Sequence, residues 1–429
     1  MFETIPAAWR RVPLSSLGQR VRRRNTTGNT NVLTISAVHG LVNQKEFFNK
    51  IVASENLSNY FLLKSGEFAY NKSYSNGYPV GVVRRLKRYQ SGILSPLYIC
   101  FDMSSSEVDE RYAELFFDSQ WFIDEINQIA KEGARNHGLL NVGVGEFFDL
   151  EFVLPPLPEQ QKIAAILSSV DDVIAKTRAQ IDKLKDLKTG MMQELLTKGI
   201  GHTEFKDSPV GRIPVSWNVT RLGDVTQKFQ NGYAFKASGY VDEGIPIISM
   251  ASIGLDGNFN AGYSKTKHWD AGELRALERY IVQDGDLLIA MTDVTPTMEL
   301  IGRCCIAQIS QPHLLNQRVG LIRLDSSRVN KHFVAYYSNH EIWRDYARGM
   351  SGLGAQANLG TPQIANGIIP LPPLEEQEQI ASILQSIDKI IKAKEEKASK
   401  GQAAKKALMQ DLLTGKVRVK VDQKESAVA

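Results

Sequence analysis

The sequence has little of what disulfide-bonded, zinc-binding or membrane-spanning proteins need. Its 429 residues include three cysteines, Cys100 and the adjacent pair Cys304 and Cys305, and no C-x-x-C spacing that would place two thiolates on one zinc ion. No window approaches 18 uncharged apolar residues, and the opening MFETIPAAWRRVPL contains no apolar run of signal-peptide length. We therefore expect no structural disulfide, no zinc site and a cytoplasmic location.

Motifs of common catalytic sites are also missing. The glycine-rich stretch at 349–360, GMSGLGAQANLG, lacks the G-K-[ST] ending of a phosphate loop, and Gly415 and Lys416 precede no hydroxyl residue. The seven histidines show no H-E-x-x-H spacing, and no G-x-S-x-G elbow is present. These absences predict a chain that is not an enzyme and that holds no cofactor and no metal.

The phrase LPPL, at 154–157 and again at 371–374, superficially resembles the D/N-P-P-Y/F/W loop of amino-methyltransferases. In that loop an Asp or Asn accepts hydrogen bonds from the target amine, and an aromatic ring stacks on the flipped base. Both flanking positions here are leucine in both copies, so neither task can be performed. We reject the catalytic interpretation of LPPL.

What the sequence does contain is a long internal repeat. LPPLPEQQKIAAIL returns as LPPLEEQEQIASIL, and residues 154–200 align without a gap to 371–417, with about twenty identical pairs. A shorter repeat links IPAAW at 5–9 to IPVSW at 213–217. A chain of this length exceeds what one hydrophobic core usually fills. The repeat therefore predicts two tandem halves, each with its own globular body.

The repeated segment has the pattern of a coiled-coil helix. Proline fits the first turn of a helix and acidic residues favour its positive end, so we expect helices that begin at about Pro158 and about Glu375. Residues spaced alternately by four and three form a heptad stripe in each copy, but the centre of the second stripe is small and polar, which leaves a close contact or a weakened one open. The stripes are Ile163, Leu167, Val170, Ile174, Thr177, Ile181, Leu184, Lys188, Met191 and Leu195, and Ile380, Leu384, Ile387, Ile391, Lys394, Ala398, Gly401, Lys405, Leu408 and Leu412.

Each helix could cover only its own body, but the gapless duplication favours pairing of one helix with the other. Parallel pairing would require the second body to carry the chain back along the whole helix, about 55 Å for about 37 residues. Antiparallel pairing needs no such return. We therefore expect an antiparallel two-helix spacer with the two bodies at its opposite ends, related by an approximate internal two-fold axis.

The two bodies have the pattern of α+β domains. β-prone runs occupy 32–38, 66–70, 97–102, 245–250, 285–291 and 318–324, and helical stretches occupy 108–130 and 330–347. The fold class expected is α+β, with two globular domains separated by the antiparallel two-helix coiled-coil spacer. The boundaries expected are 1–154 and 201–371 for the domains, 155–200 and 372–417 for the spacer helices, and 418–429 for a flexible tail.

Charge is unevenly distributed along the first body. Residues 1–90 contain 14 Lys and Arg against 4 Asp and Glu, residues 91–153 contain 3 against 12, and residues 201–370 of the second body are balanced at 16 against 16. A polarised domain can present a basic face to phosphates, although a solvated basic face is an equally simple interpretation of either basic run alone. Two such runs in one body favour DNA binding.

The candidate DNA-binding residues are basic, amide and aromatic side chains in these runs and in compatible loops of the second body. Arginine forks suit phosphates and the O6 and N7 edge of guanine, and asparagine and glutamine suit adenine. The candidates are Arg20, Arg22, Arg23, Arg24, Asn25, Lys72, Arg84, Arg85, Lys87, Arg88, Lys228, Asn231, Tyr233, Lys236, Lys265, Lys267, Gln317 and Arg318.

Over its whole length the chain resembles the DNA-specificity subunit of type I restriction–modification systems. The resemblance is carried by the repeated L-P-P-L-x-E-Q-x-x-I-A-x-I-L spacer, its M-Q-E/D-L-L-T ending, NGYAFK at 231–236 and SGLGAQANL at 351–359. It implies two recognition domains that read a split target in double-stranded DNA. It also implies two methyltransferase subunits that methylate adenine with S-adenosylmethionine and two ATP-dependent restriction subunits as partners. An orphan or decoy DNA-binding protein and a coiled-coil scaffold without a DNA role remain alternatives.

Overall fold

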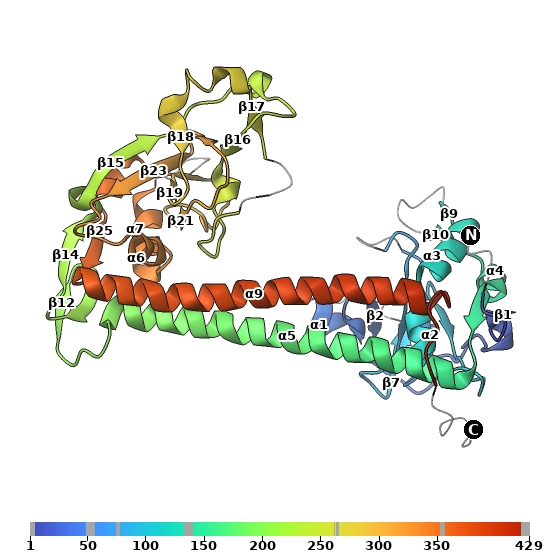
Figure 1. Ribbon diagram of the computed structural model, residues 1–429. Helices are drawn as coiled ribbons and strands as arrows, with labels where there is room; N and C mark the ends of the chain where they lie inside the picture. The colour runs from blue at the N-terminus through green and yellow to red at the C-terminus, as the bar shows by residue number, and fades with distance from the viewer. Residues whose placement is uncertain are drawn as a thin grey trace. The chain divides into compact units, whose positions relative to one another are not determined.

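The computed structural model describes residues 5–48, 56–73, 78–132, 140–260, 262, 266–351 and 357–421. The chain divides into two compact units, residues 1–178 with 396–429 (unit 1) and residues 179–395 (unit 2). Each unit contains an α+β body and a part of each long helix, α5 (Leu157–Lys198) and α9 (Leu374–Leu412) (Figure 1). Lys265, residues 352–356 of the glycine-rich stretch and residues 422–429 of the expected tail lie outside the described residues.

The long helices begin within one residue of the positions expected from the sequence. Pro156 and Pro373 accept the first hydrogen bonds, from the backbone N–H groups of Glu159 and Glu376, so each helix starts directly after a Pro-Pro pair. These glutamates lie in the first helical turn, where the positive end of the helix favours a negative charge. Gly199 follows α5 directly with a φ of 67°, a left-handed conformation that terminates the helix.

Within each unit the two helices lie side by side and run in opposite directions. In unit 1 Lys405 of α9 forms an ion pair with Asp171 of α5 at 2.7 Å. In unit 2 Lys188 of α5 pairs with Asp388 of α9 at 2.6 Å, and Lys185 pairs with Glu395 at 2.8 Å. Increasing numbers on α5 thus meet decreasing numbers on α9 in unit 2. The same holds in unit 1, where Asp171 meets Lys405 and Ile174 meets Gly401, so the pairing is antiparallel in both units.

Every position of both heptad stripes is buried or half-buried. At the small centre of the second stripe, a Cβ added to Gly401 would lie 3.1 Å from Cγ1 of Ile174, so the absent side chain lets the two helices of unit 1 approach closely. Lysine replaces an apolar residue at Lys394, whose Nζ donates to Oε1 of Gln180 at 2.7 Å. Of the two alternatives for this region, the structure therefore has the close contact at Gly401.

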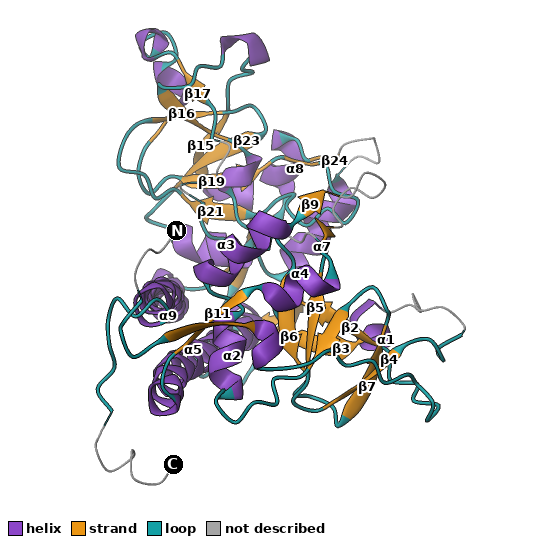
Figure 2. Cartoon of the chain, turned by 90° about the vertical axis from the view of Figure 1, so that its right-hand side faces the viewer, coloured by secondary structure: helices purple, strands orange, loops and turns teal. Residues whose placement is uncertain are grey.

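The body of unit 1 is built from short strands and helices. Its elements are β1 (Arg10–Pro13), β2 (Leu33–Ser36), β3 (Gly40–Asn43), α1 (Gln44–Phe48), β4 (Phe61–Lys64), β5 (Phe68–Asn71), β6 (Val82–Arg85), β7 (Ser91–Leu94), β8 (Ile99–Phe101), α2 (Glu110–Phe116), α3 (Gln120–Ile129), β9 (Lys131–Glu132), β10 (Leu140–Asn141), α4 (Val144–Asp149) and β11 (Glu151–Leu154). The central sheet has the order β6-β5-β8, and smaller antiparallel pairs join β1 to β11, β2 to β3 and β4 to β7. Figure 2 shows α2 between β6 and α5.

The body of unit 2 follows a similar order with larger sheets. Its elements are β12 (Phe205–Ser208), β13 (Gly211–Pro214), β14 (Asn218–Arg221), β15 (Thr226–Asn231), β16 (Ile245–Ile248), β17 (His268–Trp269), β18 (Ile281–Val282), β19 (Leu287–Ala290), β20 (Thr292–Asp293), β21 (Cys304–Ile306), β22 (His313–Leu315), β23 (Val319–Leu324), α6 (Lys331–Tyr337), α7 (Glu341–Met350), β24 (Ala357–Asn358), α8 (Thr361–Asn366) and β25 (Ile368–Leu371). The two four-stranded sheets have the orders β15-β23-β19-β21 and β17-β16-β22-β18.

The helical stretches expected at 108–130 and 330–347 each form two helices instead of one. In unit 1 the hydroxyl of Ser119 accepts from the N–H of Phe122 and starts α3 after α2 has ended. In unit 2 Nδ1 of His340 accepts from the N–H of Ile342 and starts α7 after α6. Local capping by a polar side chain therefore interrupts an apolar pattern that continues through both helices.

A buried glutamine, at the same position of the repeat in both units, connects each body to a long helix. In unit 1 Nε2 of Gln160 donates to the carbonyls of Pro155 and Glu107, both at 2.8 Å, and its Oε1 accepts from the N–H of Asp109. In unit 2 Gln377 donates to the carbonyls of Pro372 and Arg328 and accepts from the N–H of Asn330. Both side chains are completely buried. Asp109 and Asn330 in turn cap α2 and α6, so each glutamine links the start of the long helix to the start of a body helix.

A tryptophan–glutamate contact lies beside each glutamine. Nε1 of Trp9 donates to Glu159 at 3.1 Å in unit 1, and Nε1 of Trp217 donates to Glu376 at 2.9 Å in unit 2. These tryptophans come from the IPAAW and IPVSW phrases, which explains why the sequence repeats them. Glu159 also pairs with Arg418, a residue of the expected tail, so the chain segment after α9 is tied to unit 1.

Candidate nucleic-acid interface

One end of the four-stranded sheet β15-β23-β19-β21 gathers most of the candidate residues of unit 2. Asn231, the last residue of β15, lies opposite Gly320 at the start of β23, and Ala290, the last residue of β19, lies opposite Val319. The loops that leave the sheet here span 231–236 and 316–318, and we call them the loop edge of unit 2. Antiparallel register therefore brings together segments that are more than 80 positions apart in the sequence.

Backbone hydrogen bonds hold the two loops against each other. The N–H of Tyr233 donates to the carbonyl of Leu315 at 2.7 Å, and the N–H of Gln317 donates to the carbonyl of Tyr233 at 3.0 Å. Gly232 allows this approach, since a Cβ there would collide with the backbone of Asn316. The loop edge is thus a preformed surface rather than two independent loops.

The side chains of this loop edge have the chemistry of a nucleic-acid contact. Asn231, Tyr233, Lys236, Gln317 and Arg318 are all exposed, as is Lys228 on β15. The ring of Tyr233 is held by Phe235 and Tyr280, with ring centroids 5.0 and 5.3 Å away. In the described part of the chain no carboxylate pairs with Lys228, Lys236 or Arg318. Their charges are therefore available to phosphates or base edges. Lys267 lies apart, with Nζ over the ring of Tyr240.

Unit 1 has a corresponding end of its central sheet. At the end of β5, Asn71 lies opposite Val82 at the start of β6 and Tyr70 lies opposite Ile99 at the start of β8, and the turn 95–98 leads into β8. We call residues 71–73, 78–81 and 95–98 the loop edge of unit 1. Lys72 belongs to it directly, because it is the residue after β5.

Two candidate cations of unit 1 lie near each other without a carboxylate partner among the described residues. Burial lowers the pKa of the Lys72 ammonium, and the nearby Arg20 guanidinium lowers it further. The Arg20 guanidinium lies 5.8 Å from the ring centre of Phe61, and its buried Nε has no hydrogen-bond partner. Arg22 is exposed and likewise has no ion-pair partner in the described residues. Two neighbouring cations without a compensating anion favour the binding of a phosphate.

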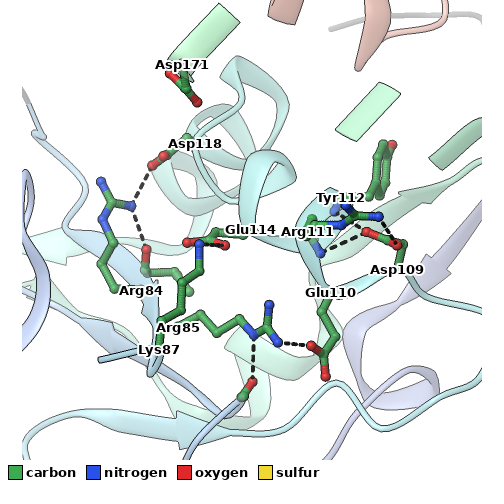
Figure 3. Close-up of polar contacts among 12 residues, drawn as sticks. Arg84, Arg85, Lys87, Asp109, Glu110, Arg111, Tyr112, Glu114, Asp118 and Asp171 are labelled. Atoms are coloured by element: carbon green, nitrogen blue, oxygen red, sulfur yellow. Dashed lines mark hydrogen bonds and ion pairs between the residues drawn. The ribbon is translucent and has the colours of Figure 1, made fainter. Parts of the chain in front are cut away.

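Other candidate cations of unit 1 are neutralised inside the domain (Figure 3). Arg84 pairs with Asp118 at 2.8 Å, Arg85 pairs with Glu110, and Lys87 pairs with Glu114 at 2.6 Å. The three carboxylates lie on α2 or directly after it, and the cations lie on β6 or just after it. The Arg84 side chain is only 11 % exposed and also donates to the carbonyl of Ala37, in the turn between β2 and β3. These contacts join β6 to α2, so the acidic segment offsets the basic segment.

The remaining candidates of unit 1 also have partners within the domain. Arg23 pairs with Glu67, and Arg88 approaches Glu46 at 3.7 Å. Arg24 donates to the carbonyl of Asn59 and lies over the ring of Phe61. Asn25 is buried and exchanges hydrogen bonds with the backbone of Asn29, which shapes the loop before β2.

The described residues contain no group of three or more His, Cys, Asp or Glu that could hold a metal ion. All three cysteines are free and buried, and burial raises the pKa of the Cys100 and Cys304 thiols to about 12, which keeps them protonated and unreactive. No helix in this part of the chain is long and apolar enough to cross a membrane.

Sequence reasoning missed the acidic partners of the basic runs and the two buried glutamines. A signal for the glutamines was present, because Gln160 and Gln377 occupy the same position of the repeat. Counted along the sequence, the carboxylates on α2 and just after it form a separate acidic region. Their spacing of four residues, Glu110, Glu114 and Asp118, places them on one helix face and was the available signal for a charged interface.

Comparisons with known proteins agree with this architecture. A family model described as "Type I restriction modification DNA specificity domain" matches residues 107–186 and 214–400. The type I restriction enzyme MjaVIII specificity subunit of Methanocaldococcus jannaschii is 31 % identical over 333 residues, which cover 77 % of this chain and 76 % of that protein. The putative MjaX specificity subunit of the same organism is 34 % identical over 281 residues, 63 % of this chain and 60 % of that protein.

Two solved structures share the fold at low sequence identity. A chain from a study of complex assembly and conformational transition of a type I restriction–modification system superposes with a TM-score of 0.58 at 17 % identity, covering 96 % of this chain and all of that chain. The S subunit of a type I system from M. genitalium superposes with a TM-score of 0.55 at 13 % identity, covering 96 % of each chain.

Proposed function

Because the chain belongs to the family of type I restriction–modification DNA specificity subunits, we propose that it binds double-stranded DNA sequence-specifically and reads a target in two pieces, one with each recognition domain. The observation that carries the proposal is the loop edge that each unit forms at the same end of its central sheet. In the described residues no carboxylate pairs with Lys72 of the unit 1 edge or with Lys236 and Arg318 of the unit 2 edge. Phosphate contacts from such cations would position the domain, and the neighbouring side chains would read the bases.

Within this function we distinguish two groups among the candidate residues. We propose Arg20, Arg22, Lys72, Lys228, Lys236 and Arg318 as direct DNA contacts, with Asn231, Tyr233 and Gln317 as readers of base edges. The residues paired with α2, namely Arg84, Arg85 and Lys87, would act on DNA binding through the position of β6 and of the turn that Arg84 holds.

The paired helices would serve as the spacer that fixes the number of unread base pairs between the two half-sites. α5 has 42 residues and α9 has 39, and both are continuous. A continuous helix of this length is about 60 Å long, and pairing along a heptad stripe stiffens it. A fixed spacing of half-sites, about one turn of DNA apart, would follow from a spacer that cannot change its length.

The exposed faces of the helices would bind the partner subunits. Val173 on α5 and Ile390 on α9 are 52 % and 47 % exposed, and they occupy the same position of the internal repeat. One such apolar site in each unit supports docking of two copies of one methyltransferase subunit, with two restriction subunits completing the complex. In this assignment the chain itself is non-catalytic, and the assembled complex is an adenine-N6 methyltransferase and an ATP-dependent endonuclease.

The test is to purify the chain with the methyltransferase subunit that accompanies it and to map N6-methyladenine in DNA treated with the complex and S-adenosylmethionine. We expect two short sequences separated by a constant gap. Replacing Arg318 by Ala should relax one half-site and leave the other unchanged, at a cost of about 1–3 kcal/mol if the arginine reads a guanine. Val215→Ala, at an exposed position that belongs to neither loop edge, serves as the control.

Two outcomes would contradict the proposal. Salt-dependent DNA binding without a methyltransferase complex would indicate an orphan or decoy DNA-binding protein. DNA affinity that does not change with salt would remove the phosphate contacts and favour a coiled-coil scaffold.

A further inference from the structure

The loop edges of the two units contain the same β-turn. In unit 1 the N–H of Tyr98 donates to the carbonyl of Ser95 at 3.1 Å, and the N–H of Leu97 donates to the Ser95 hydroxyl at 3.4 Å. In unit 2 the N–H of Val319 donates to the carbonyl of Asn316 at 2.9 Å, and the N–H of Arg318 donates to Oδ1 of Asn316 at 3.1 Å. The turn of unit 1 follows β7 and leads into β8, an end strand of the sheet β6-β5-β8, and the turn of unit 2 follows β22 and leads into β23, an inner strand of the sheet β15-β23-β19-β21.

This equivalence places Leu97 at the position that Arg318 occupies in unit 2. Both are the third residue of a four-residue turn, and both side chains are exposed. Leu97 is 64 % exposed, although leucines of the surrounding strands, such as Leu94, are completely buried. Pro96 before it fixes the backbone of the turn, which holds Leu97 in position.

The surroundings of this turn are those expected of a surface that approaches DNA. β5 and β8 are antiparallel, and the pairing of Tyr70 with Ile99 brings the end of β5, with Lys72 next to it, beside the start of β8. An exposed leucine near a cation that has no carboxylate partner among the described residues would contact the apolar part of a nucleic acid, whose phosphates the cation attracts. In the major groove the apolar feature of a base pair is the 5-methyl group of thymine.

We propose that Leu97 is a specificity-determining residue that contacts the 5-methyl group of a thymine in the half-site read by unit 1. This inference rests on the proposed function, because it needs a DNA target. The two units then use one backbone turn to present different readers, an apolar side chain in unit 1 and a guanidinium in unit 2. No charge or hydrogen-bonding pattern in the sequence identifies Leu97. What identifies it is a feature of the structure, its exposure at a position equivalent to Arg318.

The test is a double-substitution cycle on the full chain assembled with its methyltransferase subunit. DNA duplexes carry the mapped target with thymine replaced by uracil, which lacks only the methyl group, in one half-site at a time. The protein is wild type, Leu97→Ala or the control Val215→Ala. Burying one methyl group contributes about a fourfold change in affinity, so uracil in one half-site should weaken wild-type binding about fourfold. For Leu97→Ala the same uracil should have no effect.

Each outcome has one meaning. Equal sensitivity of the wild type and Leu97→Ala to uracil in both half-sites would overturn the role of Leu97 while leaving the proposed function intact. Target half-sites without any thymine would overturn it as well. Absence of specific DNA binding by every protein, including the wild type, would instead overturn the proposed function. Leu97→Arg, which copies the residue of unit 2, should abolish the uracil effect and change the base preferred in that half-site.

Discussion

The two units use different contacts at the junction between a sheet strand and a body helix: ion pairs in unit 1 and a buried cysteine in unit 2. In unit 1 β6 packs on α2 through Arg84, Arg85 and their acidic partners. In unit 2 the corresponding strand β21 packs on α6 through the buried Cys304, whose N–H donates to the Ser338 hydroxyl. The junction is therefore ionic in unit 1, whereas in unit 2 it consists of a buried thiol and a hydrogen bond to a helix-end hydroxyl.

The connection between body and long helix differs from this junction, because it is the same in both units. Gln160 and Gln377 have equivalent partners, and Trp9 and Trp217 each donate to a glutamate in the first turn of a long helix. A buried network that satisfies several backbone groups at once leaves few alternatives, whereas an apolar or ionic contact leaves many. Conserving this connection within the chain keeps each body at a fixed orientation to its own stretch of spacer helix.

The largest loss of stability is therefore expected at the connection between body and long helix, which is the same in both units. Replacing Gln160 or Gln377 by Met keeps the side-chain volume but leaves three buried backbone groups without partners. We expect each change to destabilise its own unit by about 3 kcal/mol or more. Urea unfolding measures the stability lost in each variant, and hydrogen exchange in α2 and α6 shows which unit has lost it. A loss in one unit twice that in the other would show that the two connections are not equivalent.

A smaller loss of stability is expected at the junction between strand and body helix, which differs between the units. Arg84→Met removes hydrogen bonds to Asp118 and to the Ala37 carbonyl, and we expect a cost of about 2 kcal/mol in unit 1. Because Asp118 is partly exposed, raising the salt concentration should reduce the difference between this variant and the wild type. Cys304→Ala in unit 2 is the matched variant, and its cost, about 1 kcal/mol, should not depend on salt. Equal salt dependence of both variants would contradict an ionic junction in unit 1.

These junctions also show what the sequence could and could not predict. The long helices, their antiparallel pairing and the repeat were predictable because heptad spacing and proline placement are local signals. The partners of the basic side chains were not predictable, because charge counted along the chain does not reveal which side chains meet. Arg84, Arg85 and Lys87 belong to a basic segment, but β6 carries them onto a helix whose carboxylates neutralise them. Arg318, in a body with balanced charge, has no such partner in the described residues.

A third comparison concerns two equivalent ion pairs between the long helices. Asp388 accepts from Lys188 and also from the hydroxyl of Tyr336 at 2.7 Å, whereas Asp171 in unit 1 pairs with Lys405 and is about half exposed. Asp388→Asn should therefore destabilise unit 2 by about 1–2 kcal/mol, and Asp171→Asn should cost unit 1 about 0.5 kcal/mol or less. Urea midpoints of the two variants measure the difference. Reversal of this order would show that Tyr336 does not strengthen the pair in unit 2.

The smallest effect tests the close approach of the helices in unit 1. Gly190 lies on α5 with open space around the position of a Cβ, so Gly190→Ala should stabilise the helix by about 0.5–1 kcal/mol. Gly401→Ala should gain the same stabilisation from helix propensity. The gain should be cancelled by crowding, because the new methyl group would lie 3.1 Å from Cγ1 of Ile174. Thermal unfolding should therefore raise the midpoint for Gly190→Ala and leave it nearly unchanged for Gly401→Ala. If both variants gained equally, the helices would not be in close contact at Gly401, and the small centre of the second stripe would be a weakened contact instead.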